Sequence, residues 1–340
     1  MASVQEALGL RQASNLTSLS ERLLPLLRQD DTLDVVGNAD GALWVNRLGR
    51  GFKHEGQYSP TKTTMLLSGI ATMRQVHLNH DNPVLETIFP LTGDRIEGLI
   101  SPVVEAPVFA IRTRPKKIYR LSDMAESGIL TDNRDPRNSK RHHDDFVEQA
   151  SSCTHVEIIR LACRYRRNIL LVGPTGSGKT SVANGIIAEW AEVTPNDRVV
   201  IIEDTPELQC SLPNHVQLLA ATHVSQADLL VTSLRLMPRR IVVGEVRDEE
   251  PARVLLGAWN TGHSGGLATI HANDALNGLR KLETLIGGHG ASVRERVASA
   301  IDVVIFIDGE ESLPAGRKVR EVMVVRAFDR DSQDYAVQYV

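Results

Sequence analysis

Residues 168–190 read NILLVGPTGSGKTSVANGIIAEW, and this stretch decides the fold. An apolar run typical of a buried strand leads into a glycine-rich loop, and a helix-like run follows it. The loop GPTGSGKT (173–180) satisfies the pattern G-x-x-x-x-G-K-[ST]. Its glycines let backbone N–H groups converge on phosphate oxygens, and the dipole of the following helix favours the same negative charge. The sequence therefore predicts a P-loop that binds a nucleoside triphosphate.

Each part of this loop has an expected task. Lys179 is expected to reach the β- and γ-phosphates, and the Thr180 hydroxyl is expected to ligate Mg²⁺. The residues expected to contact the nucleotide are Gly173, Pro174, Thr175, Gly176, Ser177, Gly178, Lys179, Thr180 and Ser181. A chance glycine-rich turn is the alternative, but the strand before the loop and the helix after it are the context that the motif requires.

Strand-like and helix-like runs alternate from residue 146 onward. Strands are predicted at 168–172, 198–203, 216–220, 240–245, 267–271 and 302–308, with helices between them that include 249–259 and 274–286. Such alternation favours an α/β fold with a mostly parallel sheet covered on both faces. Ligands of these sheets bind at the carboxyl ends of the strands, so we expect residues at strand ends to face the phosphates.

Two of these strands end in acidic residues. RVVIIEDTPEL (198–208) ends its apolar run at Glu203, and RIVVGEVRDEE (240–250) ends at Glu245, in the manner of a Walker B strand. If both strands neighbour the P-loop strand, both carboxylates lie beside the metal. One would then hold Mg²⁺ through water, and the other would orient or deprotonate the attacking water.

Other features of these two segments leave alternatives open. Gly244, directly before Glu245, departs from the common Walker B pattern. Acids at strand ends can also cap the next helix, and for Asp204 and Glu207 a capping role and a role in the site stay equally open.

Residues 1–115 have a different pattern, which predicts a compact α+β domain. Two strands around an Asp-Gly turn are expected at 34–46, further strands at 49–58 and 106–115, a helix at 59–78, and a hairpin at 83–102 that turns at 92–94. Residues 132–145, DNRDPRNSKRHHDD, contain no aliphatic or aromatic side chain and are interpreted as a linker. The expected organisation is therefore 1–115, a linker at 116–145, and 146–340.

Composition excludes several classes of protein. The net charge of −4 does not favour wholesale nucleic-acid binding. The three cysteines include no CxxC pair, which excludes a zinc ribbon or a thioredoxin motif. The first residues contain no apolar signal core, and no apolar run approaches the length of a membrane span. We therefore expect any membrane contact to be peripheral or to go through partners.

ATP hydrolysis is the favoured chemistry. The sequence contains no N-K-x-D motif of GTPases and no lid-like insertion with paired arginines, as a small-molecule kinase requires. In TGHSGGLATIHANDA (261–275), His271 ends a predicted strand, so it is interpreted as a sensor of the γ-phosphate. His263 precedes that strand, where it could orient the loop or face a neighbouring subunit. A structural role for His263 is at least as well supported as these. His77, His80, His142 and His143 are interpreted as solvated because no further metal ligands cluster with them.

Four elements stand in order along the chain: GPTGSGKT, IIEDTPEL, SLRLMPRRIVVGEVRDEE and TGHSGGLATIHANDA. Together they resemble the Walker A, Asp box, Walker B and His box of the secretion traffic ATPases, over roughly residues 150–310. The pattern at 234–247 is close to the type IV secretion branch. Residues 93–112 and 119–130 are similar to segments of its conjugative-transfer (TrbB-like) branch. The resemblance implies a RecA-like P-loop domain and a smaller PAS-like α+β domain before it.

The resemblance also implies roles for single residues. Glu203 and Glu245 would share water activation and the positioning of Mg²⁺, with Lys179 and His271 as the other catalytic residues. Arg112, in VFAIR, would reach phosphate from the first domain. For Arg235, Arg239 and Arg247, charge neutralisation at the site or across a subunit border and a surface salt bridge remain equal alternatives.

The family further implies a homohexamer at the cytoplasmic face of the inner membrane, held there by inner-membrane components of a type IV secretion machine. No direct sequence-specific nucleic-acid binding is expected. The favoured function is a cytoplasmic ATPase that powers conjugative type IV secretion, for pilus assembly, DNA–protein transfer or both. The alternatives are a pilus-retraction motor with the same chemistry, a DNA-translocating RecA-like ATPase, and an assembly protein that binds nucleotide without hydrolysing it.

Overall fold

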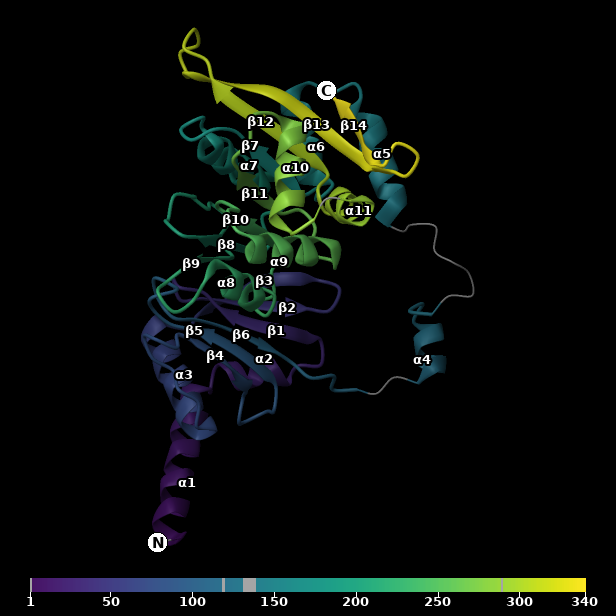
Figure 1. Cartoon of the computed structure of the whole chain (residues 1–340). Coiled ribbons are helices and arrows are strands. Elements are labelled where there is room, and N and C mark those ends of the chain that lie inside the picture. Colours follow the sequence, from purple (N-terminus) through teal and green to yellow (C-terminus); the bar gives the residue numbers. More distant parts are fainter. Residues whose placement is uncertain (1, 118–119, 131–138, 289) are drawn as a thin grey trace.

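Two β-sheets, one from each half of the chain, organise the computed structural model (Figure 1). The structure describes residues 2–117, 120–130, 139–288 and 290–340. Among these residues no helix is long and apolar enough to cross a membrane.

The first sheet is antiparallel and has the strand order β3-β2-β1-β6-β5-β4. Its strands are β1 (Thr32–Gly37), β2 (Ala42–Arg47), β3 (Gly51–Gln57), β4 (Val84–Ile88), β5 (Arg95–Leu99) and β6 (Val108–Arg112). The two hairpins predicted at 34–46 and 83–102 are confirmed, because β1 pairs with β2 and β4 pairs with β5. The sheet and its helices form the predicted α+β arrangement; its PAS-like description stays a prediction.

Three helices belong to this part of the chain: α1 (Ala2–Leu19), α2 (Leu23–Arg28) and α3 (Pro60–Arg74). The helix predicted at 59–78 begins as expected, since the Ser59 side chain accepts a hydrogen bond from the backbone of Lys62. It ends earlier than predicted because Gln75 adopts a left-handed conformation. The first two helices were not predicted, and Figure 1 shows α1 extending away from the sheet.

The second sheet has the order β14-β13-β12-β7-β11-β10-β8-β9. Its strands are β7 (Ile169–Val172), β8 (Val199–Glu203), β9 (His215–Leu219), β10 (Arg240–Val243), β11 (Leu267–Ile270), β12 (Val303–Gly309), β13 (Arg317–Asp329) and β14 (Asp334–Tyr339). All neighbouring strands from β12 to β9 are parallel, which confirms the mostly parallel sheet. The antiparallel strands β13 and β14 were not predicted.

Helices cover both faces of this sheet. They are α5 (Ser139–Ala150), α6 (His155–Arg164) and α7 (Lys179–Val193) on one face, and α8 (Gln226–Ser233), α9 (Glu249–Asn260), α10 (Ala275–Leu285) and α11 (Ala291–Ala300) on the other. In β7, Ile169 and Leu171 pack on the face covered by α5 to α7, whereas Leu170 and Val172 pack on the face covered by α8 to α11. Every residue of β7 is therefore buried, as expected for a strand covered on both sides.

The segment between the two sheets differs in part from the predicted linker. Residues 139–145 belong to helix α5, which continues to Ala150, and a short helix α4 spans Leu121–Glu126. Phe146 and Ala150 are fully buried and hold the end of α5 against the second sheet, so a helix forms although residues 132–145 are polar. Residues 132–138 and the side chains of His142 and His143 lie outside the described part of the chain. The domain boundaries at 115 and 146 stay predictions.

The two sheets meet at a buried polar contact. Arg198, directly before β8, donates hydrogen bonds to the side-chain oxygens of Asn38 and Asn214 and to the Leu236 carbonyl, each at 2.6 Å. Complete burial lowers the pKa of Arg198 to about 9. Apolar residues of both sheets join one core cluster, which includes Val36, Trp44, Val216 and Leu218.

Candidate nucleotide-binding site

The predicted P-loop connects β7 to α7 in the structure. Gly176 and Gly178 have φ values of 76° and 97°, a left-handed conformation that favours glycine. A Cβ on Gly173 would lie only 2.2 Å from the carbonyl oxygen of Ile307, so the loop also needs glycine there. A cavity of about 490 Å³ opens above this loop at the carboxyl ends of the parallel strands. The glycines therefore have the backbone role that the sequence motif predicts.

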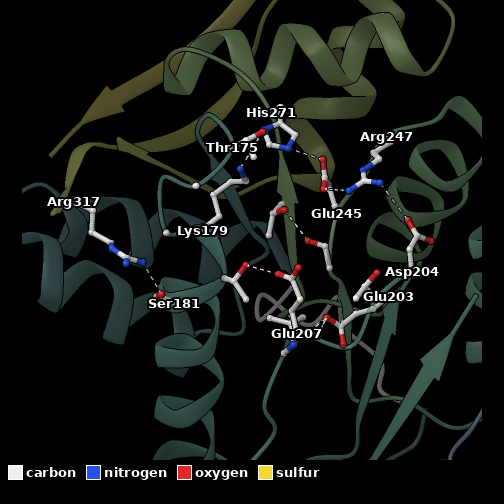
Figure 2. A pocket seen from close by; sticks show the side chains of 17 residues that line it. Thr175, Lys179, Ser181, Glu203, Asp204, Glu207, Glu245, Arg247, His271 and Arg317 are labelled. Atoms are coloured by element: carbon white, nitrogen blue, oxygen red, sulfur yellow. Dashed lines mark hydrogen bonds and ion pairs between the residues drawn. The ribbon is translucent and has the colours of Figure 1, made fainter. Parts of the chain in front are cut away.

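The Lys179 ammonium group lies within this cavity (Figure 2). It donates hydrogen bonds to the carbonyl oxygens of Gly173 (2.8 Å) and Pro174 (2.9 Å). Burial lowers the pKa of Lys179, and the nearby Glu245 carboxylate partly opposes this effect. The two carbonyl oxygens thus hold the ammonium group in the cavity, where the oxygens of a bound anion can replace them as its hydrogen-bond acceptors.

Glu245 and His271 lie in contact with each other beside the lysine. The His271 Nε2 atom lies 2.8 Å from one Glu245 oxygen, and the other oxygen accepts a hydrogen bond from Arg247 at 2.6 Å. The His271 Nδ1 atom lies 3.1 Å from the Gly173 carbonyl and 3.2 Å from the Lys179 nitrogen. Although burial acts to raise the pKa of Glu245, Arg247, His271 and Lys179 together lower it. Glu245 is therefore held as a carboxylate.

Glu203 is held in a different way. One of its oxygens accepts hydrogen bonds from the backbone N–H groups of Glu207 and Leu208, both at 3.0 Å. The other is buried and has no hydrogen-bond partner among the described residues. Burial raises the pKa of Glu203, and the two backbone hydrogen bonds oppose this. A Cβ on Gly244 would lie 2.9 Å from the Glu203 Cγ atom, so the departure from the Walker B pattern makes room for Glu203.

The two residues that follow the P-loop lysine, Thr180 and Ser181, have side-chain partners in the cavity. The Thr180 hydroxyl donates to Glu207 at 3.1 Å, and the Ser181 hydroxyl accepts from Arg317 at 2.8 Å. Glu207, whose role the sequence left open, therefore lines the cavity. Arg317 also lines it, yet no motif in the sequence pointed to this residue.

The strand order corrects one premise of the sequence analysis. Strands β8 and β10, which carry the acids, do not neighbour β7, because β11 lies between β7 and β10. Glu203 and Glu245 nevertheless line the same cavity as Lys179, since all these parallel strands end at one edge of the sheet. Asp204 lines it too, with a carboxylate oxygen 3.9 Å from Arg247.

Arg112 is not brought to this cavity within the chain. Its Nε atom donates to Asp34 at 3.1 Å, and it lines a separate cavity of about 950 Å³ together with Arg239 and His263. Arg239 and His263 precede β10 and β11, so this second cavity lies at the amino ends of the strands, opposite the P-loop. Burial lowers the pKa of His263, and a hydrogen bond to the Pro238 backbone opposes this.

The three arginines whose roles stayed open lie in three places. Arg247 lines the P-loop cavity, and Arg239 lines the cavity at the opposite edge. Arg235 pairs with Glu86 of the first sheet at 2.8 Å. Only the first of these positions, Arg247, is next to the P-loop.

The cavity suits a triphosphate with a magnesium ion. The buried hydroxyl of Ser177 and one oxygen of Glu203 have no partner among the described residues, so both can accept a ligand contact. No group of three or more His, Cys, Asp or Glu side chains in the described residues is arranged to hold a metal alone. Proteins commonly hold Mg²⁺ through one or two side chains, water and substrate phosphates.

The chain is similar to known proteins over most of its length. Residues 148–308 match the family model of the Type II/IV secretion system proteins. The chain is 38% identical over 312 residues to the conjugal transfer protein TrbB of Rhizobium radiobacter, which covers 92% of this chain and 89% of that protein. It is 29% identical over 324 residues to the type IV secretion system protein PtlH of Bordetella pertussis, covering 89% and 93% of the two chains.

A solved structure shares the fold. The VirB11 ATPase of the Brucella suis type IV secretion system matches with a TM-score of 0.81 and 24% identity, over 93% of this chain and 96% of that one.

Proposed function

Because the chain belongs to the secretion traffic ATPases of type IV secretion systems, in their conjugative-transfer (TrbB-like) branch, we propose that it hydrolyses ATP to power conjugative type IV secretion. The observation that carries this proposal is the meeting of Lys179, Glu203, Glu245 and His271 around one cavity above the P-loop. The solved structure that shares the fold is an ATPase of a type IV secretion system, which supports ATP as the substrate.

The proposed chemistry divides the work among these side chains. Lys179 exchanges its loop carbonyls for the β- and γ-phosphate oxygens, and residues 173–181 surround the phosphates. Glu203, which has a free oxygen and a raised pKa, accepts a proton from the attacking water. His271, between Glu245 and the P-loop carbonyl, lies on the γ-phosphate side.

Thr180 and Glu245, the latter through water, are the residues that would hold Mg²⁺. When bound, the ion neutralises charge on the β- and γ-phosphate oxygens. The Thr180 hydroxyl would have to leave Glu207, to which it donates a hydrogen bond at 3.1 Å. Burial lowers the pKa of Lys179, whereas the lowered pKa of Glu245 reflects Arg247, His271 and Lys179 close to it.

The proposed assembly is a homohexamer. Within one chain Arg112 lies at the edge of the sheet opposite the P-loop, so its proposed phosphate contact requires a swing of the two domains or a neighbouring subunit. We place the hexamer at the cytoplasmic face of the inner membrane, where it associates peripherally through inner-membrane components of the secretion machine. Direct sequence-specific binding of nucleic acid is no part of this function.

The Lys179→Ala variant tests the proposal. Loss of the ammonium group should lower ATP hydrolysis by about a hundredfold or more, because transition-state charge on the phosphates loses its nearest cation. Phosphate release from the purified protein measures this. Lys62→Ala is the matched control, since Lys62 also lies in the first turn of a helix but is exposed and remote from the cavity.

In donor cells, Lys179→Ala should also abolish transfer of the conjugative plasmid, whereas Lys62→Ala should support it. Turnover at the normal rate in Lys179→Ala would contradict the assignment of an ATPase. Normal hydrolysis combined with no role in plasmid transfer would leave an ATPase and remove the conjugative function.

A further inference from the structure

Among the described residues, Arg317 is the one cationic residue that lines the P-loop cavity from outside the four motifs and outside residues 148–308, which match the family model. It is the first residue of β13 and follows the loop that closes the β12–β13 hairpin. Its guanidinium donates to the Ser181 hydroxyl at 2.8 Å and to the Ala315 carbonyl at 3.2 Å. The last part of the chain thus contributes a positive charge to the site.

Arg317 lies directly across the end of the P-loop. A Cβ on Gly178 would be 2.4 Å from the Arg317 Cδ atom and 2.6 Å from one guanidinium nitrogen. Only a glycine at position 178 permits this approach, so the loop and the arginine are fitted to each other. The contact also places the guanidinium at the amino end of α7, where backbone N–H groups are free to bind an anion.

The described part of the chain places no opposite charge against Arg317. Its hydrogen-bond partners are a hydroxyl and a carbonyl, and no carboxylate of the described residues lies within 4 Å of its guanidinium. Arg320, three residues further along the same strand, pairs with Glu310 at 2.9 Å. Of these two arginines, Arg320 is paired with a carboxylate and Arg317 faces the cavity.

The sheet order decides which end of a nucleotide Arg317 can meet. Strand β12, with β13 beside it, flanks β7 on one side, whereas β11, β10 and β8 lie on the other. Figure 2 shows Arg317 and Ser181 across the P-loop from Glu245 and Arg247. If the γ-phosphate faces Glu245 and His271, the opposite side of the loop receives the α-phosphate and the nucleoside.

We propose that Arg317 binds the α-phosphate of the nucleotide and so orients the nucleoside end beneath the loop at residues 310–316. The inference rests on the proposed nucleotide-binding function and extends the site to the carboxyl-terminal hairpin. The Arg317 guanidinium donates a hydrogen bond to the Ser181 hydroxyl. When the nucleotide binds, an α-phosphate oxygen replaces the hydroxyl as the acceptor of that hydrogen bond. Arg317 is a binding residue and takes no part in cleaving the γ-phosphate.

The test compares Arg317→Ala and Arg317→Gln with Arg320→Ala, an exchange of the paired arginine on the same strand. Binding of ADP, ATP and inorganic tripolyphosphate is measured by titration calorimetry, and kcat by phosphate release. In both Arg317 variants, the affinity for each of the three ligands should fall by about tenfold, which is the loss expected for one charge-assisted hydrogen bond to phosphate. Their kcat should stay within about twofold of the parent chain, since uniform binding is what is lost. Arg320→Ala should change neither quantity.

Three results would overturn the inference. Unchanged ADP affinity in both Arg317 variants would show that the arginine does not reach the nucleotide. Weaker ADP binding with unchanged tripolyphosphate binding would assign Arg317 to the nucleoside and not to phosphate. A loss confined to kcat would move it to the γ-phosphate. If the parent chain binds ADP and ATP normally, each of these outcomes leaves the proposed ATPase intact; failure of the parent chain to bind either nucleotide removes both proposals.

Discussion

Gly244 sets the position of Glu203. The glycine directly follows β10, the strand next to β8, and its missing side chain leaves the space that the Glu203 methylene groups occupy. This gives the buried carboxylate a fixed direction into the cavity, with one oxygen held by two backbone N–H groups. In the proposed mechanism, a side chain at position 244 would therefore act on catalysis through Glu203.

We expect Gly244→Ala to lower kcat by about a hundredfold, because a displaced catalytic group loses that much with a shift near 1 Å. ADP affinity should stay within about twofold, since no phosphate contact changes. Gly257→Ala is the control, because a Cβ there meets nothing within 4 Å. Steady-state phosphate release and ADP titration measure both quantities. A parent-like kcat in Gly244→Ala would mean that Glu203 does not act on water.

Single residues were predictable where a general rule applies to them. The rule that ligands bind at strand ends pointed to Glu245 and His271, and both lie beside Lys179. Asp204 and Glu207 stayed open because a helix cap and a phosphate-site acid look the same in sequence. Arg317 could not be found, because a strand far along the chain brings it to the loop and no local pattern records that pairing.

Helix α10 packs closely on the P-loop strand. A Cβ on Gly278 would lie 2.5 Å from a Val172 methyl carbon, so the helix and β7 touch at this glycine. Val172 is the last residue of β7, directly before the phosphate loop. The height of α10 above the sheet thus depends on one missing side chain.

Gly278→Ala should destabilise the protein by about 1–3 kcal/mol, the usual cost of overpacking a core. Gly185→Ala in α7 is the matched control, because the space around it is open and alanine favours helices. That control should be neutral or stabilising by about 0.5–1 kcal/mol. Urea unfolding followed by circular dichroism gives both values. Equal stability of the two variants would show that α10 does not rest on β7 at this point.

Elements with a clear pattern of apolar residues along the sequence were predictable, and those without such a pattern were not. The six strands from β7 to β12 are apolar runs bounded by polar residues, and each was expected near its observed position. In β13 only a central stretch is buried, and the polar residues around it hide the strand. Helix α5 begins in a polar segment and is held by Phe146 and Ala150 at its other end, which a local composition argument cannot detect.

At the scale of the whole molecule, the contact between the two sheets buries a carboxyl group. Glu97 of β5 is 3% exposed, and neither of its oxygens has a partner among the described residues. It lines a cavity of about 450 Å³ between the first sheet and residues 234–237. Burial, helped by Glu86 and opposed by Arg235, raises the pKa of Glu97 to about 8.

This pKa makes stability depend on pH. Between the ordinary glutamate pKa and about 8, the folded protein keeps the proton that the unfolded chain has released, so stability falls as pH rises. Glu97→Gln removes the effect and should stabilise the protein at pH 8 by on the order of 2–4 kcal/mol, with little gain at pH 4.5. Thermal unfolding at both pH values measures this. Glu105→Gln, at an exposed site, is the control.

A gain from Glu97→Gln that is the same at both pH values would show that the carboxyl group titrates normally. Neither this burial nor the relative position of the sheets was predictable. The sequence indicates most of the strands of each sheet, but contacts such as Arg198 with Asn38 join residues far apart along the chain. The strand order that places β11 between β7 and β10 is likewise a property of the folded sheet.

Strand β8 runs from the contact with the first sheet to the P-loop cavity. Arg198, held by Asn38 of the first sheet, directly precedes the strand, and Glu203 is its last residue. Five extended residues span about 16 Å. In the proposed mechanism, a displacement of the amino-terminal sheet that pulls on Arg198 would act on one short, hydrogen-bonded strand, whose last residue carries the carboxylate proposed to accept the proton from water. Mechanical load on the first sheet would then reach that carboxylate through the length of one strand.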